Sequence, residues 1–413
     1  MRVLLISANR ERLDMTALPL GLGLVAAATR RAGHEVAFLD LGAGDDPAEA
    51  VRHAIERHHP EVIGVSVRNI DDQCRETPRF LLDQARTVVE HCRARSDAPI
   101  VLGGAGYSIF PREALRYLGA DFGVAGDGEE VFPSLLERVA AGEAAPDLPG
   151  VHAPGHEPRT ARALADDLDA LPLWDDGLTA SVTPDVWVPV QSRRGCPNDC
   201  SYCSTARIQG RRIRARTPRS VADAIRRVAS AGARRFFFVD NTFNIPEEYA
   251  LELVRELAAL RPRVSWRCIL YPHRVREELV SAMAAAGCVE VSLGFESGCP
   301  RILREMNKRF SPEDVRHASD LLFAHGIRRT GFLLLGGPGE TPESVEQSLA
   351  FARSLKLENL RVTVGIRIYP GTALARRAVA EGVIASEEEL LQPRFYLAPG
   401  LEPWIHDRVG APG

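Results

Sequence analysis

Lysine is almost absent from this sequence of 413 residues, in which Lys308 and Lys356 are the only two. Neither follows a predicted strand directly, so a catalytic lysine that forms a Schiff base with its substrate is nearly excluded. The formal net charge is −4 and the isoelectric point is near 6.3. A chain without a basic excess lacks the electrostatic footprint of a nucleic-acid-binding protein, so we expect no nucleic-acid partner.

Long apolar runs are missing as well. No run approaches the roughly 20 residues that a membrane-spanning helix needs, and the apolar run Val3–Ser7 is too short for a signal peptide. We therefore expect no membrane span and a cytoplasmic location. Hydrophobic residues make up 45% of the chain and charged residues 26%, which is an ordinary globular composition. The length suggests two domains.

Histidine is lacking around the most informative stretch, QSRRGCPNDCSYCST, which places Cys196, Cys200 and Cys203 in a C-x3-C-x2-C pattern. Three thiolates at this spacing can ligate three irons of a [4Fe–4S] cluster and leave the fourth iron open. A closed zinc site is the alternative, but it would need a fourth protein ligand, and the range 195–213 contains no histidine. Three unrelated buried cysteines are disfavoured because Pro197–Asp199 form a polar turn.

The other cysteines, Cys74, Cys92, Cys268, Cys288 and Cys299, are irregularly spaced. In a cytoplasmic enzyme we interpret them as free thiols with mainly structural roles. Cys299 lies in the turn S-G-C-P between a predicted strand and a predicted helix, and we keep it as a candidate catalytic residue.

Residues 1–145 alternate short apolar strands with amphipathic helices. Strands are predicted at 2–7, 35–40, 62–67, 100–103 and 122–124, and helices near 19–32, 48–58, 78–94, 111–118 and 128–140. This alternation is typical of a doubly wound parallel α/β sheet, which binds ligands at the carboxyl ends of its strands.

A dinucleotide is not the expected ligand of this sheet. Its fingerprint G-x-G-x-x-G would follow the first strand, and the range 7–18 contains no glycine. The later strand ends carry the candidate ligand-binding residues, namely Ser66, Val67, Arg68, Asn69, Gly103, Gly104, Gly106, Gly126 and Glu129. Glycines there would let the backbone approach a flat or bulky ligand closely, although ordinary loop glycines are an equal alternative.

The next segment, 146–185, is rich in proline, glycine and alanine at its start. This composition favours a linker that crosses the surface. His152 and His156 lie within it, and we expect both to be solvated.

From residue 186 to 382 the strand and helix alternation resumes. Strands are predicted near 186–192, 235–240, 264–270, 289–295, 330–336 and 361–368. Six β/α units are too few for a closed barrel of eight, so we expect a partial (β/α)6 barrel with an active site at the carboxyl ends of its strands.

Polar residues and glycines close several of these strands. These strand ends carry Asp240, Asn241, Glu296, Gly336 and Arg367, which the family resemblance given below makes candidate cofactor-binding residues. Each has a structural alternative, because Asp and Asn also form turns and a Glu can lie beside a helix cap. The basic run 207–219 has no interleaved aromatic residues for stacking bases, so we interpret it as a loop that closes over the cysteines. The tail, 383–413, carries Phe395, Tyr396 and Trp404, which either reach the open side of the barrel and the substrate or cap its bottom.

The cysteine stretch resembles the radical S-adenosylmethionine (SAM) superfamily, in which an aromatic residue precedes the last cysteine, as Tyr202 does here. The resemblance implies a [4Fe–4S] cluster whose open iron is chelated by the amino and carboxylate groups of SAM. Reductive cleavage of SAM would then give a 5′-deoxyadenosyl radical. The resemblance also makes Tyr202 a second candidate catalytic residue, and it implies an external reductant, a flavodoxin or a ferredoxin.

The stretches GVSVRNIDDQ, PIVLGGAGYSIFP and GVAGDGEEVF resemble the cobalamin-binding domain that precedes the radical SAM barrel in one subfamily. Cobalamin domains with a histidine ligand carry D-x-H-x-x-G, and this sequence does not have that motif after its first strand. The resemblance therefore implies base-off cobalamin without a histidine ligand, and Arg68 or Asn69 could shield the lower face.

The function that the resemblance implies is methylation of an unactivated carbon of a small molecule, with a methyl group passing from SAM through cobalamin. A non-methylating cyclisation, ring contraction or rearrangement is the alternative reaction class. A cobalamin or iron–sulfur regulatory module without turnover is a third hypothesis, because the sequence alone does not separate these three.

Overall fold

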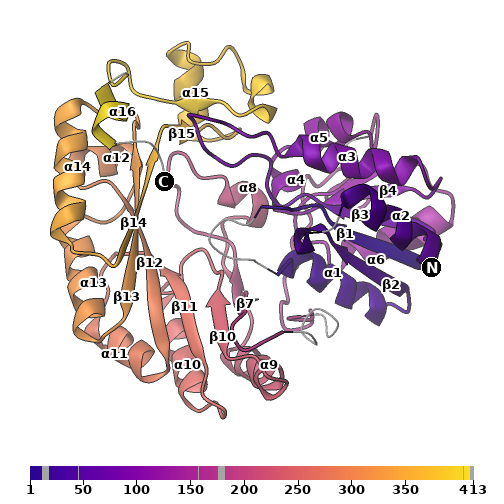
Figure 1. Ribbon diagram of the computed structural model, residues 1–413, viewed down its shortest axis with the longest axis horizontal. Coiled ribbons are helices and arrows are strands. Elements are labelled where there is room, and N and C mark those ends of the chain that lie inside the picture. The colour runs from indigo at the N-terminus through magenta and orange to yellow at the C-terminus, as the bar shows by residue number, and fades with distance from the viewer. Residues whose placement is uncertain (12–17, 45, 157, 175–181, 403, 410–413) are drawn as a thin grey trace. The chain divides into compact units, whose positions relative to one another are not determined.

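The computed structural model of the chain describes residues 1–11, 18–44, 46–156, 158–174, 182–402 and 404–409. These residues form two compact units (Figure 1). The first consists of 1–72, 79–182 and 207–210, and the second of 73–78, 183–206 and 211–413. Residues 175–181 of the expected linker and 410–413 of the tail lie outside the described residues.

The first unit is built on a six-stranded sheet in the order β2-β1-β3-β4-β5-β6. Its strands are β1 (Arg2–Ser7), β2 (Glu35–Asp40), β3 (Val62–Ser66), β4 (Ile100–Gly103), β5 (Phe122–Val124) and β6 (Val151–His152). All neighbours pair in parallel except β5 and β6. The order 2-1-3-4-5 is that of a doubly wound sheet, with its switch point between β1 and β3, so the expected fold class is confirmed.

Helices cover this sheet, and all of them except the short α4 lie where the apolar periodicity predicts them. They are α1 (Leu20–Arg31), α2 (Pro47–His58), α3 (Leu82–Arg93), α4 (Ala105–Ile109), α5 (Pro111–Leu118) and α6 (Val131–Ala140), with a short 3-10 turn at Leu41–Ala43. Asp46 caps α2 by accepting a hydrogen bond from the Ala48 backbone, and Pro47 follows at the first helical position. Side chains of β1, β4, α1 and α6 form a buried apolar core.

The segment after α6 is more than a surface linker. Strand β6 extends the first sheet, Gly126 forms a parallel bridge with Ala163, and Ala165, Leu168 and Leu171 form a small buried cluster. His152 is 3% exposed rather than solvated. The proline and glycine content predicted irregular backbone correctly, but an irregular segment can still pack against a sheet when its scattered apolar residues face it.

The second unit is built on a six-stranded parallel sheet in which each strand pairs with the next along the chain. Its strands are β7 (Trp187–Val190), β10 (Arg235–Phe238), β11 (Ser265–Leu270), β12 (Cys288–Glu296), β13 (Arg328–Leu335) and β14 (Asn359–Val364). Sequential parallel order is that of a barrel wall, and β7 and β14 are not paired with each other. The partial barrel is therefore confirmed.

The connecting helices lie on the outer face of this sheet (Figure 1). They are α9 (Pro218–Ser230), α10 (Glu247–Ala258), α11 (Glu277–Ala285), α12 (Pro300–Glu305), α13 (Pro312–Ala324) and α14 (Pro342–Ser354). Along β11 the residues Trp266, Cys268 and Leu270 are buried, whereas the alternate residues are half-buried. Because side chains alternate across a strand, Ser265, Arg267 and Ile269 face the inner, concave side.

Smaller elements complete the second unit. They are the short helix α8 (Thr205–Gln209), the strands β8 (Arg193–Arg194) and β9 (Arg214–Ala215), the strands β15 (Ile366–Arg367) and β16 (Phe395–Tyr396), and the helices α15 (Ala373–Ala380) and α16 (Trp404–Val409). The tail returns to pair β16 with β15 beyond the carboxyl end of β14. Neither Phe395 nor Tyr396 therefore caps the bottom of the barrel. No helix among the described residues combines the length and apolar character needed to cross a membrane.

Candidate active site at the carboxyl ends of the barrel strands

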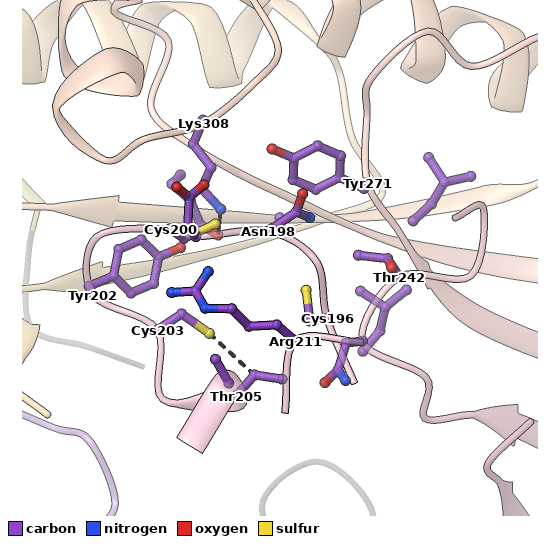
Figure 2. Close-up of a pocket in the computed structure, with 17 residues that line it drawn as sticks. Cys196, Asn198, Cys200, Tyr202, Cys203, Thr205, Arg211, Thr242, Tyr271 and Lys308 are labelled. Atoms are coloured by element: carbon purple, nitrogen blue, oxygen red, sulfur yellow. Dashed lines mark hydrogen bonds and ion pairs between the residues drawn. The ribbon is translucent and has the colours of Figure 1, made fainter. Parts of the chain in front are cut away.

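One cavity of about 240 Å³ opens at the carboxyl ends of β10, β11 and β12, and it contains all three cysteines of the motif (Figure 2). Its lining residues are Cys196, Asn198, Asp199, Cys200, Tyr202, Cys203, Thr205, Ala206, Arg211, Asn241, Thr242, Ile269, Leu270, Tyr271, Gly294, Glu296 and Lys308. The strand ends and the cysteine loop therefore meet at one place, as the barrel rule predicts.

The cysteine loop is fixed by backbone hydrogen bonds to two distant segments. The Ser201 backbone N–H donates to the Met306 carbonyl at 3.0 Å, and the Leu374 N–H donates to the Ser201 carbonyl at 2.8 Å. Gly195 opens the loop with a φ of +91°, and a Cβ there would lie 2.1 Å from the Arg212 carbonyl oxygen. Only glycine fits such a position, so the turn before Cys196 is determined by backbone geometry.

Asp240 holds the strand that leads into this loop. Its carboxylate is 1% exposed and accepts hydrogen bonds from the backbone N–H groups of Ser192 and Arg193 at 2.8 and 3.0 Å. It also accepts from the Ser192 hydroxyl and from the Arg193 guanidinium. Asp240 does not line the cavity, because its oxygens are already engaged. The structure thus supports a positioning role rather than the cofactor contact expected from sequence.

The cysteine thiols differ in exposure. Cys196 is buried, Cys200 is half-buried and Cys203 is exposed, with its Sγ 3.2 Å from the Thr205 hydroxyl. Burial raises the pKa of the Cys196 and Cys200 thiols, and the positive charge of Lys308 opposes that rise. Within the described residues no three His, Cys, Asp or Glu side chains converge on a single ion. A cubane cluster does not require such convergence, because each of its thiolates binds a different iron. The donor set therefore fits a cluster better than a zinc ion.

Lys308 lines the cavity and was not among the candidates from sequence. Its side chain is 6% exposed, and its Nζ lies 3.3 Å from Glu296 Oε1 and 5.3 Å from the centre of the Tyr202 ring. Figure 2 shows Lys308 and Tyr202 reaching toward each other beside Cys200. Burial alone would lower the pKa of Lys308, but the Glu296 carboxylate, 3.3 Å from its Nζ, raises it well above its ordinary value. Burial together with Glu296 also raises the pKa of Tyr202, so the cavity holds an ammonium ion beside a neutral phenol.

Glu296 owes its position to an irregularity in its strand. The register between β12 and β13 shifts at Gly294 and Glu296, and Glu296 has a φ of +62°. Bulges of this kind redirect a side chain near a functional site. The rarity of lysine in this chain was the signal that could have drawn attention to its partner, Lys308.

Among the other candidates in the barrel, Asn241 lines the cavity and donates to the Gly195 carbonyl at 3.2 Å. Cys299, Gly336 and Arg367 do not line it. Cys299 is a buried residue at the start of α12, where its N–H donates to the Ser297 hydroxyl. The Arg367 guanidinium donates to the backbone carbonyls of Ile368 and Leu390 and so fastens the tail.

Gly336 is engaged in structure as well. Its N–H donates to the buried carboxylate of Glu340, which also accepts from the Gly337 N–H at 2.8 Å. A Cβ on Gly336 would lie 2.4 Å from the Leu397 side chain. The fifth strand end is thus closed by contacts with the tail and with Glu340.

In the first unit, the candidate residues lie together at the carboxyl edge of β3, β4 and β5. Several of the glycines are explained by the chain itself. A Cβ on Gly104 would lie 2.5 Å from the Val67 carbonyl oxygen, and one on Gly126 would lie 2.1 Å from the Ala163 carbonyl oxygen. Gly106 approaches the backbone of Arg68 in the same way. These three glycines are therefore required by close contacts between loops of the protein itself.

Gly103 is different, since a Cβ there would meet nothing closer than the Val124 carbonyl oxygen at 3.9 Å. Ser66, the last residue of β3, pairs with Gly103 in register, and its side chain is half-buried. Arg68 is exposed directly after the strand, and the Asn69 amide lies 3.5 Å from the Asn9 side chain. Glu129 is buried. These residues lie at the carboxyl ends of β3 and β4, which is the edge where a doubly wound sheet places its ligand.

Comparison with known families agrees with both halves of this description. Residues 190–352 match the radical SAM superfamily, and residues 7–136 match the B12 binding domain. The chain therefore contains a B12 binding domain followed by a radical SAM domain. This radical SAM enzyme is 26% identical over 404 residues to the uncharacterised methyltransferase PH0819 of Pyrococcus horikoshii, covering 93% of this chain and 84% of the relative.

Two further relatives extend the comparison. Tryptophan 2-C-methyltransferase of Streptomyces laurentii is 24% identical over 445 residues, covering 89% of this chain and 73% of that protein. The solved structure of the radical SAM methyltransferase TsrM from Kitasatospora setae, with tryptophan and a SAM analogue bound, superposes with a TM-score of 0.85. It is 24% identical and covers 99% of this chain and 88% of that one, so it supports the fold.

Proposed function

We propose that this enzyme transfers a methyl group from SAM, by way of cobalamin, to an unactivated carbon of a small molecule. The observation that carries the proposal is the meeting of Cys196, Cys200, Cys203 and the Glu296–Lys308 pair in one cavity, in a chain that also has a B12 binding domain. When bound, the cluster would supply the electron that cleaves SAM and the cobalamin would carry the methyl group.

The residues of the barrel divide the work in this proposal. The three cysteines hold the cluster, and Lys308 balances the negative charge of their thiolates. Glu296 accepts hydrogen bonds from SAM hydroxyls, since a carboxylate is a strong acceptor. Tyr202, kept neutral by its surroundings, packs against the same ligand. Asn241 joins the loop at Gly195 to the end of β10 and borders the SAM site.

The first unit holds cobalamin at the ends of β3 and β4 in this proposal, with the cobalamin base-off and without a histidine ligand. The sequence has no histidine before His34, and Arg68 is an exposed side chain at the strand end. Arg68 or Asn69 would shield the lower face of the cobalamin. Electrons reach the cluster from a flavodoxin or a ferredoxin.

The decisive experiment is anaerobic reconstitution with iron, sulfide and hydroxocobalamin, followed by reduction in the presence of SAM with a trideuterated methyl group. The expected result is a reducible cluster, bound base-off cobalamin, and formation of 5′-deoxyadenosine and S-adenosylhomocysteine. A variant with Cys196, Cys200 and Cys203 all changed to alanine should keep cobalamin and lose the cluster. Cys299→Ala is the matched control and should keep both.

Product mass separates the reaction classes. Small-molecule extracts should yield a product that carries the trideuterated methyl group. A product whose mass is unchanged or reduced by hydrogen would replace methylation with cyclisation or rearrangement. A protein loaded with both cofactors that leaves SAM intact under strong reduction would be a regulatory module instead.

A further inference from the structure

The inner face of the second sheet continues below the cavity, and Arg267 is its most unusual residue. Ile269, two residues later on β11, lines the cavity, and same-face neighbours on a strand lie about 7 Å apart. The Arg267 Cζ lies 4.3 Å from the centre of the Trp187 ring and 4.7 Å from that of Phe237. Contact with two aromatic faces fixes the guanidinium in place.

The Arg267 guanidinium is fixed by these rings, but two of its nitrogen atoms lack hydrogen-bond acceptors among the described residues. Its Nε and Nη2 atoms are buried and have no hydrogen-bond partner among the described residues. Burial of a charged donor without an acceptor is unfavourable. The nearest acid on the neighbouring strand, Glu290, is directly opposite Arg267 in register, but its Oε1 accepts from the Thr330 hydroxyl at 3.2 Å. Arg267 therefore has hydrogen-bonding capacity left for another acceptor.

The rest of this face has an excess of positive charge and an exposed apolar ring. Arg328 is opposite Glu290, and Arg361 is opposite Phe332 on the edge strand β14. The intervening Arg329 bonds to Ser319 of α13, which shows that the alternate residues face inward. Phe332 is 40% exposed on this concave side. Such a face fits a ligand with one anionic group and an apolar body.

We propose that Arg267 is a specificity-determining residue that binds the anionic group, a carboxylate or a phosphate, of the substrate. The apolar body of that substrate would lie along Phe332 and reach up to the cavity. A guanidinium pairs with either anion through two parallel hydrogen bonds, and the stacked rings of Trp187 and Phe237 pre-orient it. This inference rests on the proposed function for its meaning, but its test does not require turnover.

The test is equilibrium dialysis of the cofactor-loaded enzyme, under anaerobic conditions and with SAM present, against three probes. They are 3-phenylpropionate, phenyl phosphate and the uncharged 3-phenylpropionamide. Wild type should bind at least one anion about tenfold or more tightly than the amide, the effect of one charge-assisted hydrogen-bond pair. Whichever anion is preferred identifies the carboxylate or the phosphate as the natural group.

Variants assign the preference to Arg267. Arg267→Gln should abolish the preference for the anion over the amide, and Arg267→Lys should keep part of this preference. Arg263→Gln, at an exposed arginine, is the matched control and should keep the full preference. Glu290→Gln should strengthen anion binding several-fold, because it removes an opposing charge. Glu290→Gln also keeps the test decisive if Arg267→Gln fails to retain cluster and cobalamin.

Equal binding of acid and amide, no binding of either anion, or a preference that survives Arg267→Gln would refute the inference. The two proposals fail separately. SAM cleavage and methyl transfer without any anion preference would leave the proposed function standing and remove the role of Arg267. An anion preference that depends on Arg267, in a protein that never cleaves SAM, would keep the role of Arg267 and remove the proposed function.

Discussion

The two sheets of this enzyme present very different groups at the carboxyl ends of their strands. The second sheet gathers side chains that carry charge or sulfur, with Cys196, Lys308 and Glu296 in one cavity. The first sheet presents mainly backbone, with Gly104 and Gly126 packed against other loops. The difference teaches that one strand edge is defined by chemically specific side chains, whereas the other is defined largely by the close packing of its loops.

The same contrast appears within the barrel between two acids at strand ends. Both oxygens of Asp240 accept hydrogen bonds, Oδ1 from the backbone of Ser192 and Arg193 and Oδ2 from their side chains, whereas Glu296 faces the cavity and pairs with Lys308. An acid at a strand end is therefore a site residue only when the fold leaves an oxygen available. The following predictions test this distinction, beginning with the largest expected effect.

Asp240→Asn should destabilise the protein by about 3 kcal/mol, because it breaks a buried ion pair with Arg193 and leaves the guanidinium unpaired. Cluster content should fall with it, since the loop loses its anchor. Denaturant unfolding and iron analysis measure both effects. The control is Asp185→Asn at an exposed pair with Arg235, which should cost less than about 1 kcal/mol. Normal stability and cluster content with weakened SAM binding would return Asp240 to the cofactor-binding role expected from sequence.

Lys308→Met should weaken SAM binding by roughly 10- to 100-fold. It removes the charged hydrogen bond from Lys308 to Glu296, the proposed acceptor for SAM hydroxyls, and such bonds contribute about 1.5–3 kcal/mol. The cluster potential should become more negative, since a nearby positive charge favours the reduced state. SAM titration of the reconstituted protein and potentiometry give the two values. Lys356→Met removes the other lysine, which is exposed, and is the matched control. Unchanged SAM affinity in Lys308→Met would mean that the Glu296–Lys308 pair is structural.

Glu340→Gln should change the pH dependence of stability. Burial raises the pKa of Glu340 to about 7, although hydrogen bonds from Gly337 and Gly336 and the charge of Arg301 oppose the rise. The pKa is thus higher in the folded protein than the ordinary 4.5, so wild type should lose up to about 2 kcal/mol of stability as pH rises from about 5 to 7. Glu340→Gln should lack this loss.

Parallel denaturant titrations of wild type and Glu340→Gln across that pH range provide the measurement. Glu343→Gln, at an exposed carboxylate whose pKa is lowered by its hydrogen bond to Thr341, controls for removing a charge from the same segment. Identical slopes for wild type and Glu340→Gln would show that Glu340 titrates normally.

Gly103→Val should weaken cobalamin binding by at least about tenfold, or about 1.4 kcal/mol, with little change in stability, because a Cβ at Gly103 would come no closer to the protein than 3.9 Å, from the Val124 carbonyl oxygen. Gly104→Ala should behave in the opposite way. Its φ of +101° and its contact with Val67 make any Cβ strained, so stability should fall by about 1–3 kcal/mol. Absorbance of bound cobalamin and thermal unfolding separate the two effects. Full cobalamin binding by Gly103→Val would place the corrin elsewhere.

Much of the fold could be predicted from periodicity. The strands Arg2–Ser7, Glu35–Asp40 and Ile100–Gly103 have the predicted bounds, because buried parallel strands are continuous apolar runs between turn residues. The helix α4 and the strand β6 were missed. Both are short elements that form only where neighbouring segments supply their contacts.

Some residues of the candidate site could likewise be predicted from the sequence, and others could not. Cys196, Cys200 and Cys203 could be identified because their spacing favours a [4Fe–4S] cluster, and Tyr202 because the motif resembles that of a known family. Lys308 could not, since it is 105 residues after Cys203 in the chain and only folding brings it beside that loop. Arg367 and Cys299 were proposed from their places at strand ends, but neither place reveals where the side chain points.

The sequence by itself determined the local quantities of this protein: which segments are strands and helices, which three thiols share a loop, and which cofactors the two domains imply. The strands, the helices and the shared loop follow from interactions among neighbouring residues, which the order of residues specifies directly. The cofactors follow from the resemblance of the motifs to a known family. Only the tertiary structure decided that Asp240 is consumed by hydrogen bonds, that Lys308 joins Glu296, and that Arg267 keeps two donors unpartnered. Such outcomes depend on which residues distant in sequence come into contact, and on which hydrogen-bonding groups then lack a partner. Burial strengthens each pairing and raises the cost of each group left without one.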